Sequence, residues 1–203
     1  TNYIEIAHSA SQNYTGGQSV SFWIYRTGMI PAGGDQNHIL SKGAQLFSGQ
    51  NIWAGDSNNY IYYHYINGNY NTSNDCSTAQ NSFSSNNWLH YVVTNDLSNI
   101  KLYLNGSLVQ TCPISNPLTT LDGTNQGPMN FGKGRGHFGG EKGFQGRIDD
   151  IGTWNRVLTQ QEITNLYNAD TTLNPFCSTD TFEAIPNINI SSNDAILYNN
   201  EIY

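Results

Sequence analysis

Residues 88–109 read WLHYVVTNDLSNIKLYLNGSLV, and this stretch decides the fold class. It contains three runs of β-branched, aromatic and aliphatic residues, which are separated by Asn95-Asp96 and by Asn105-Gly106. Runs of this kind favour strands, and short breaks rich in Asn or Gly favour the turns between them. Asn-Gly is the strongest of these turn signals, because both residues readily adopt the positive φ angles of a type I′ turn. The stretch therefore predicts two successive hairpins.

Two segments outside this stretch also predict strands. Residues 19–25 (SVSFWIY) alternate, so that Val20, Phe22 and Ile24 share one face of a half-buried strand. Residues 60–65 (YIYYHY) have strong β propensity and carry aromatic side chains on both faces.

The composition agrees with an all-β fold. Charged residues make up only 11% of the chain, which contains 20 Gly and 13 Tyr. This balance favours strands joined by polar turns over helical bundles. A chain of 203 residues is long enough to bury one substantial core, and β-sandwiches of this size commonly form a single domain.

One short helix is expected near the C-terminal end of the predicted sandwich. Residues 159–162 (TQQE) fit a capping box, and Leu158 and Ile163 are placed for a hydrophobic staple. After this helix the sequence becomes rich in Thr, Asn, Pro and Ser, which is typical of a boundary. We expect the sandwich to span residues 1–170. Residues 171–203 then form either a C-terminal extension or the start of a following module.

The chain contains three cysteines, Cys76, Cys112 and Cys177. Cys76 and Cys112 lie at the outer edges of the predicted hairpin pair, where a disulfide is possible in an oxidising compartment. The alternative is two unrelated buried thiols. Cys177 has no assigned partner in either case.

The charge balance points away from two classes of partner. The formal net charge of −7 gives no broad positive field, so nucleic acid and anionic membrane surfaces are poor candidates. No run of about 18 apolar residues occurs, so membrane insertion is not expected.

Four stretches together resemble the bacterial laminin-G-like, concanavalin-type jelly-roll domain, in an order and spacing that match from roughly residue 1 to residue 169. They are Tyr3–Ile6 with Ser19–Ile24, Trp88–Thr94, Leu102–Gly106, and Phe144–Ile151 with Asn155–Leu158. The resemblance implies a two-sheet antiparallel jelly-roll sandwich with one short helix towards the C-terminus. It also implies function on a concave face or on rim loops. Because this fold hosts lectins, adhesion modules, glycanases and spacers, it leaves the ligand open.

The sequence offers little for catalysis. Related jelly-roll glycanases carry a Glu-x-Asp-x-x-Glu run that supplies two carboxylates about 5 to 5.5 Å apart, and no such run occurs here. Asp149-Asp150 is the one adjacent acidic pair, and neighbours on a regular strand point to opposite faces. The five histidines lack the spacing of a zinc site, and His90 is interpreted as a packed, hydrogen-bonded residue. We therefore predict that this domain is not an enzyme.

The resemblance implies a calcium site. In related sandwiches an aspartate at the position of Asp149 joins backbone oxygens and an acidic residue near the N-terminus, for which Glu5 is the candidate here. Carboxylate and carbonyl oxygens are the ligands that Ca²⁺ prefers. The alternative is that Asp149 and Asp150 cap edge amides or pair with Arg147 and Arg156.

A sugar site needs flat aromatic faces beside amides, carboxylates or a guanidinium that hold hydroxyls in a fixed pattern. Three segments supply such groups: residues 35–38, residues 56–64 and residues 133–138. If the odd-numbered tyrosines of the second segment face the core, its even-numbered aromatic residues face outwards. The alternative is that these tyrosines tile a wide sheet and the glycines only turn corners. The candidate ligand-binding residues are Asp35, Asn37, Asp56, Asn58, Tyr60, Tyr62, His64, Arg135 and His137.

These observations predict a non-catalytic carbohydrate-binding or adhesion module of a larger secreted or cell-surface protein, stabilised by calcium. Its expected partner is a glycan or another cell-surface ligand, with a protein as a further possibility. Two alternatives stay open: a structural spacer or protein-protein interaction domain without a small ligand, and an accessory module of a polysaccharide-degrading enzyme.

Overall fold

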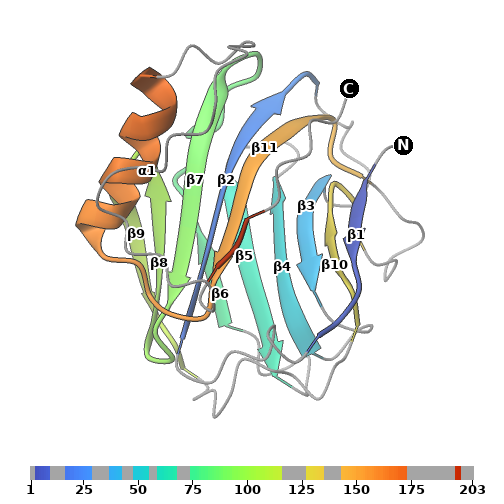
Figure 1. Cartoon of the computed structure of the whole chain (residues 1–203), viewed down its shortest axis with the longest axis vertical. Coiled ribbons are helices and arrows are strands. Elements are labelled where there is room, and N and C mark those ends of the chain that lie inside the picture. Colours follow the sequence, from blue (N-terminus) through green and yellow to red (C-terminus); the bar gives the residue numbers. More distant parts are fainter. Residues whose placement is uncertain are drawn as a thin grey trace.

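In the part of the chain that the structure describes, two six-stranded antiparallel sheets pack face to face, and one helix lies beside the second of them (Figure 1). The computed structural model describes residues 3–9, 17–28, 37–42, 48–54, 59–67, 74–115, 127–134, 143–172 and 195–197. Within these ranges no helix is both long and apolar enough to cross a membrane. The predicted fold class, a two-sheet jelly-roll sandwich with one helix, is confirmed.

The two sheets interleave segments that lie far apart in the sequence. The first sheet has the order β1 (Ile4–Ile6), β10 (Met129–Phe131), β3 (Asn37–Lys42), β4 (Ser48–Ala54), β5 (Ile61–Asn67), β6 (Asn74–Ser77). The second has the order β12 (Ala195–Leu197), β11 (Gly146–Trp154), β2 (Gln18–Arg26), β7 (Trp88–Asn95), β8 (Asn99–Leu104), β9 (Ser107–Pro113).

The two predicted hairpins are confirmed as β7–β8 and β8–β9. At the second turn Asn105 and Gly106 have φ angles of 48° and 77°, the positive values that a type I′ turn requires. The Asn105 side chain also accepts a hydrogen bond of 3.0 Å from the backbone N–H of His90. The turn residue thus holds the end of β8 against β7.

The core lies between the sheets. Val20, Phe22 and Ile24 on β2 are completely buried, as their alternation predicts. They pack with Tyr63 and Tyr65 of β5 from the opposite sheet. Burial of large aromatic and aliphatic side chains is the main stabilising contribution to such a sandwich.

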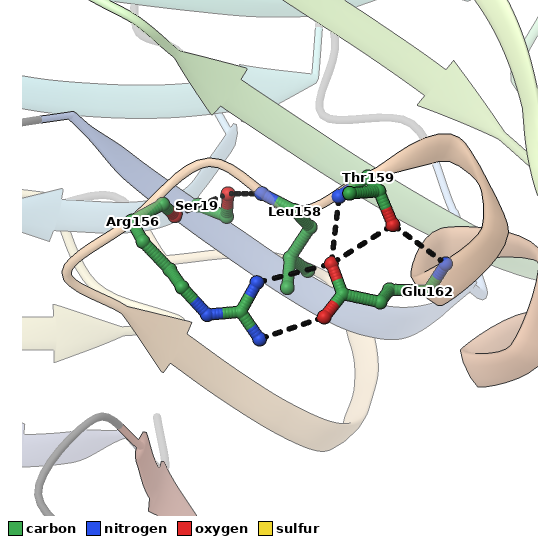
Figure 2. Close-up of polar contacts among 5 residues, drawn as sticks. All are labelled: Ser19, Arg156, Leu158, Thr159 and Glu162. Atoms are coloured by element: carbon green, nitrogen blue, oxygen red, sulfur yellow. Dashed lines mark hydrogen bonds and ion pairs between the residues drawn. The ribbon is translucent and has the colours of Figure 1, made fainter. Parts of the chain in front are cut away.

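The helix α1 (Gln160–Thr172) begins with the predicted capping box (Figure 2). The backbone N–H of Thr159 donates to the Glu162 carboxylate at 2.7 Å, and the N–H of Glu162 reaches the Thr159 hydroxyl at 3.3 Å. Arg156 donates two hydrogen bonds to the same carboxylate, of 3.0 and 2.8 Å. The Arg156 hydrogen bonds are the main reason that the pKa of Glu162 falls to about 2. Ser19 on β2 bonds the backbone of Arg156 and Leu158 and so fixes the entry to the helix.

The predicted disulfide is present. Cys76 on β6 and Cys112 on β9 are bonded, with a Cα–Cα distance of 5.7 Å. These strands are edge strands of different sheets, so the bond joins the two layers of the sandwich. Cys177 lies outside the described residues.

The alternation expected at Asp149-Asp150 is wrong, because β11 is irregular there. Its register with β2 shifts between Asp149 and Gly152, and Asp150 has a φ of 48°. A bulge of this kind adds a residue and breaks the two-residue period of a strand. Both carboxylates are consequently exposed.

The sequence predicts a boundary near residue 170, and this remains a prediction. The helix continues to Thr172, and β12 pairs with β11 through Gly152↔Leu197, Thr153↔Ile196 and Trp154↔Ala195. This short segment of the predicted C-terminal extension therefore lies against the sandwich.

Candidate functional site

The helix covers part of the outer face of the second sheet. On the second sheet α1 packs over Val92, Tyr103 and Trp154, which form a small apolar cluster with Leu158 and Ile163 of the helix region. Figure 1 shows α1 beside β8 and β9, at the side of the molecule opposite β1.

His90 belongs to this helix-covered face. Its ring lies 5.1 Å from that of Trp23 and 6.0 Å from that of Tyr167 on α1, measured between centroids. Its Nε2 atom is 2.9 Å from the Ser21 hydroxyl oxygen. Burial lowers the pKa of His90 to about 4. The interpretation of His90 as a packed, hydrogen-bonded residue is therefore confirmed.

A line of aromatic side chains follows β5 on the outer face of the first sheet. Ile61, Tyr63 and Tyr65 are buried in the core, whereas Tyr62 and His64 are partly exposed. Tyr60 precedes the strand and is also partly exposed. The predicted outward direction of the even-numbered residues is thus confirmed.

The three rings of this aromatic line lie close together in two orientations. The centroids of Tyr60 and Tyr62 are 6.4 Å apart, with an interplanar angle of 66°. The centroids of Tyr62 and His64 are 6.2 Å apart, with an angle of 25°. The line therefore presents both ring edges and ring faces.

Asp75 completes this group and was not among the predicted ligand residues. It lies opposite His64 in the β5–β6 register, and its Oδ1 is 2.5 Å from His64 Nδ1. The Asp75 side chain is 40% exposed and that of His64 only 12% exposed, so the carboxylate is the more accessible of the two. The one available signal was the alternation around Cys76, an inward-facing cysteine with Asp75 beside it.

The strand register extends this group into a polar row across the sheet. Successive Cα partners place the following residues side by side: Glu5, Asn130, Ser41, Asn51, His64 and Asp75. Asn130 and Ser41 are each only 1% exposed, and the Ser41 hydroxyl donates to the Lys133 carbonyl at 2.9 Å. Among the members of this row on β3 to β6 whose side chains are described, the accessible ones are therefore those on β5 and β6.

A second row connects this end to the glycine-rich segment. His38, Trp53, Tyr62 and Ser77 are successive partners across β3, β4, β5 and β6. A β-carbon on Gly134 would lie 2.0 Å from Cδ2 of His38, so only glycine fits against this ring. The structure therefore brings parts of all three predicted segments to one place, with His38 beside Gly134 and in the same row as Tyr62.

Arg26 on β2 binds Asn59, the residue that precedes the aromatic line. This side chain is 3% exposed, donates to Asn59 Oδ1 at 2.7 Å and lies 5.3 Å over the ring of Phe83. The backbone N–H of Phe83 also donates to the Asn59 carbonyl. These two contacts fix the position of Asn59, from which the chain continues into β5.

The remaining predicted ligand residues are only partly described. Asn37 begins β3 and pairs with Ala54 in the register. The other five, Asp35, Asp56, Asn58, Arg135 and His137, lie outside the described residues.

The two predicted calcium ligands lie on different sheets. Glu5 is on β1 of the first sheet and Asp149 is on β11 of the second, and both are exposed. Asp149 Oδ1 accepts a hydrogen bond of 2.9 Å from the Asp150 amide, as the alternative interpretation expects. In the part of the chain that the structure describes, no three His, Cys, Asp or Glu residues gather as a metal site.

Solved structures with the same fold include several binding domains. The binding domain of Paraclostridial Mosquitocidal Protein 1 is 23% identical with a TM-score of 0.62, over 82% of this chain and 41% of that one. The binding domain of botulinum neurotoxin DC, seen with rat synaptotagmin II, is 20% identical with a TM-score of 0.57, over 76% and 36%. A candidate carbohydrate-binding protein of Bacteroides ovatus is 16% identical with a TM-score of 0.60, over 80% and 43%.

This chain thus spans about two fifths of the length of these solved proteins. A search of curated proteins found no match. The model of one family, described as the concanavalin A-like lectin/glucanases superfamily, matches residues 1–164. Two antiparallel sheets, the strand order and this match over most of its length lead to one conclusion: the chain belongs to the concanavalin A-like lectin/glucanases superfamily.

Proposed function

We propose that this chain is a non-catalytic carbohydrate-binding module of an extracellular or cell-surface protein. Its ligand binds the outer face of the first sheet, at the end formed by β5 and β6. The observation that carries the proposal is the convergence of Tyr60, Tyr62, His64 and Asp75 on one partly exposed face, next to the contact of His38 with Gly134.

The chemistry of these groups suits sugars. A sugar ring packs its C–H groups on an aromatic side chain, while neighbouring acceptors bind its hydroxyls. Asp75 supplies an accessible carboxylate, and its contact with His64 fixes the orientation of the imidazole. The disulfide from Cys76, the neighbour of Asp75, limits the movement of β6. A preformed site of this kind loses little entropy when it binds a ligand.

The comparisons support a binding role in general terms. The solved proteins with this fold include binding domains of toxins and the Bacteroides ovatus protein. The domain seen with synaptotagmin II makes a protein receptor the competing function. An accessory role in polysaccharide degradation is compatible with the same site, because such modules also bind glycans.

A glycan array with the folded protein tests the proposal. Binding to a defined glycan class should fall at least tenfold in Tyr62→Ala and in Asp75→Ala. Gln110→Ala is the matched control, because Gln110 is an exposed residue on β9 of the second sheet, and it should bind as the parent does. Arg135→Ala tests the predicted contribution of the glycine-rich segment. An empty array of both glycans and polysaccharides would favour the protein-binding or spacer function instead.

We also propose that calcium stabilises the module through Asp149, with Glu5 as a second candidate. The described carboxylates do not form a cluster, so such a site would draw mainly on carbonyl oxygens. Thermal unfolding with calcium and then with excess chelator should show a drop in Tm of several degrees, and Asp149→Ala should show none. Equal Tm values with calcium and with chelator would exclude this role.

A further inference from the structure

The charge on the described residues of the proposed glycan face is of one sign. The polar row carries carboxylates at both of its ends, Glu5 and Asp75, and its other members are Asn, Ser and His. The second row, from His38 to Ser77, contains no carboxylate and no Lys or Arg. Among the residues of these two rows the only permanent charges are therefore negative.

The described basic residues near this face are already engaged. Arg26, beneath the start of the aromatic line, is buried and donates to Gly28 and Asn59. The Lys133 ammonium lies 4.2 Å from the centroid of the Tyr3 ring, at the β1 side of the sheet. Lys42 Nζ lies 2.7 Å from the Gly127 carbonyl.

The described residues of the two rows include no Arg or Lys side chain that could bind an anionic sugar. A carboxylate or sulfate group accepts hydrogen bonds and is usually held by Arg, Lys or backbone N–H groups. Asp75 is also an acceptor and carries the same sign of charge. Partial removal of water from two like charges makes their repulsion stronger than in bulk solvent. Neutral sugars instead present hydroxyl donors that a carboxylate binds well.

We propose that this face is selective for uncharged glycans and rejects the same glycans when they carry a terminal sialic acid or sulfate. This inference rests on the proposed carbohydrate function and names the class of its ligand. Asp75 acts as the group that determines the selectivity, because its carboxylate is exposed beside the described part of the aromatic line.

The test compares matched array glycans that differ only in a terminal anionic group. At pH 8 and 50 mM NaCl, the uncharged member of each pair should bind about fivefold more tightly, or better. The ratio should shrink in 500 mM NaCl, because salt screens exposed charges. Asp75→Asn should also shrink the ratio, since it removes the charge and keeps the oxygen that contacts His64.

Asp96→Asn is the control, because it makes the same change in net charge in the β7–β8 turn of the second sheet. It should leave the ratio as in the parent. Preferred binding of the sialylated or sulfated members would overturn the inference but would leave the carbohydrate function intact. A ratio unchanged by Asp75→Asn would overturn the role of this residue. An array without any glycan signal would instead reject the proposed function itself, and the selectivity with it.

Discussion

Acidification should undermine the interface between α1 and the second sheet through His90. This side chain is 2% exposed and packs between Trp23 on β2 and Tyr167 on α1, with Ser21 as its hydrogen-bond partner. Burial lowers its pKa from 6.5 to about 4, so the folded protein holds the ring neutral where the unfolded chain would protonate it. The associated stability is fully present above pH 6.5 and is lost as the pH falls towards 4.

The size of the effect follows from the two pKa values. The difference between 6.5 and about 4, at about 1.4 kcal/mol for each pKa unit, corresponds to a loss between about 3 and 4 kcal/mol of unfolding free energy well below pH 4, of which about 3 kcal/mol is lost by pH 4. Urea unfolding at pH 7.5, 5.5 and 4, followed by tryptophan fluorescence, measures it. At each pH, the unfolding free energy of His90→Gln is subtracted from that of the parent. This removes the contribution of the carboxylates, because they titrate in both proteins.

The stability of the parent relative to His90→Gln should fall by about 3 kcal/mol between pH 7.5 and pH 4. His8→Gln makes the same substitution outside the helix interface and serves as the matched control for it. Parallel pH profiles for the parent and His90→Gln would refute the argument that burial at this interface controls the protonation of His90.

Three further outcomes follow from individual contacts. Replacing Cys76 and Cys112 with serine opens a loop with a sequence separation of 36 residues, which should lower the unfolding free energy by about 4 kcal/mol in urea; an unchanged midpoint would contradict this. Thr159→Ala should lower the unfolding free energy by about 1 kcal/mol through loss of the helix cap, whereas Thr159→Ser should keep most of the stability. An equal loss in both variants would argue against the capping contribution. Gly134→Ala places a methyl group against the His38 ring and should lower the unfolding free energy by about 2 kcal/mol through overpacking. This loss should largely disappear in a His38→Ala background. A loss that persisted there would point to backbone strain as the cause.

Local chemistry explains which elements were predictable from the sequence. The Asn105-Gly106 turn, the alternation of residues 19–25 and the capping box of Thr159 with Glu162 each depend on residues within a few positions of one another. The strands β3, β4, β6 and β10 were not identified. Their sequences are short or mix polar and apolar residues, such as NDCS and SGQNIWA, so they carry little periodic signal. The break in alternation at Asp149 was also missed, because a bulge depends on the pairing of β11 with β2.

The candidate site also depends partly on local sequence and partly on tertiary contacts. The sequence by itself determined that Tyr60, Tyr62 and His64 lie on one side of a strand, because alternation is a property of the strand alone. Only the tertiary structure placed Asp75 against His64, His38 against Gly134, and Cys76 beside Cys112 of the other sheet. It also decided that α1 packs on the second sheet, whereas the aromatic line lies on the outer face of the first. These contacts depend on strand order and register, which are set by packing between segments far apart in the chain.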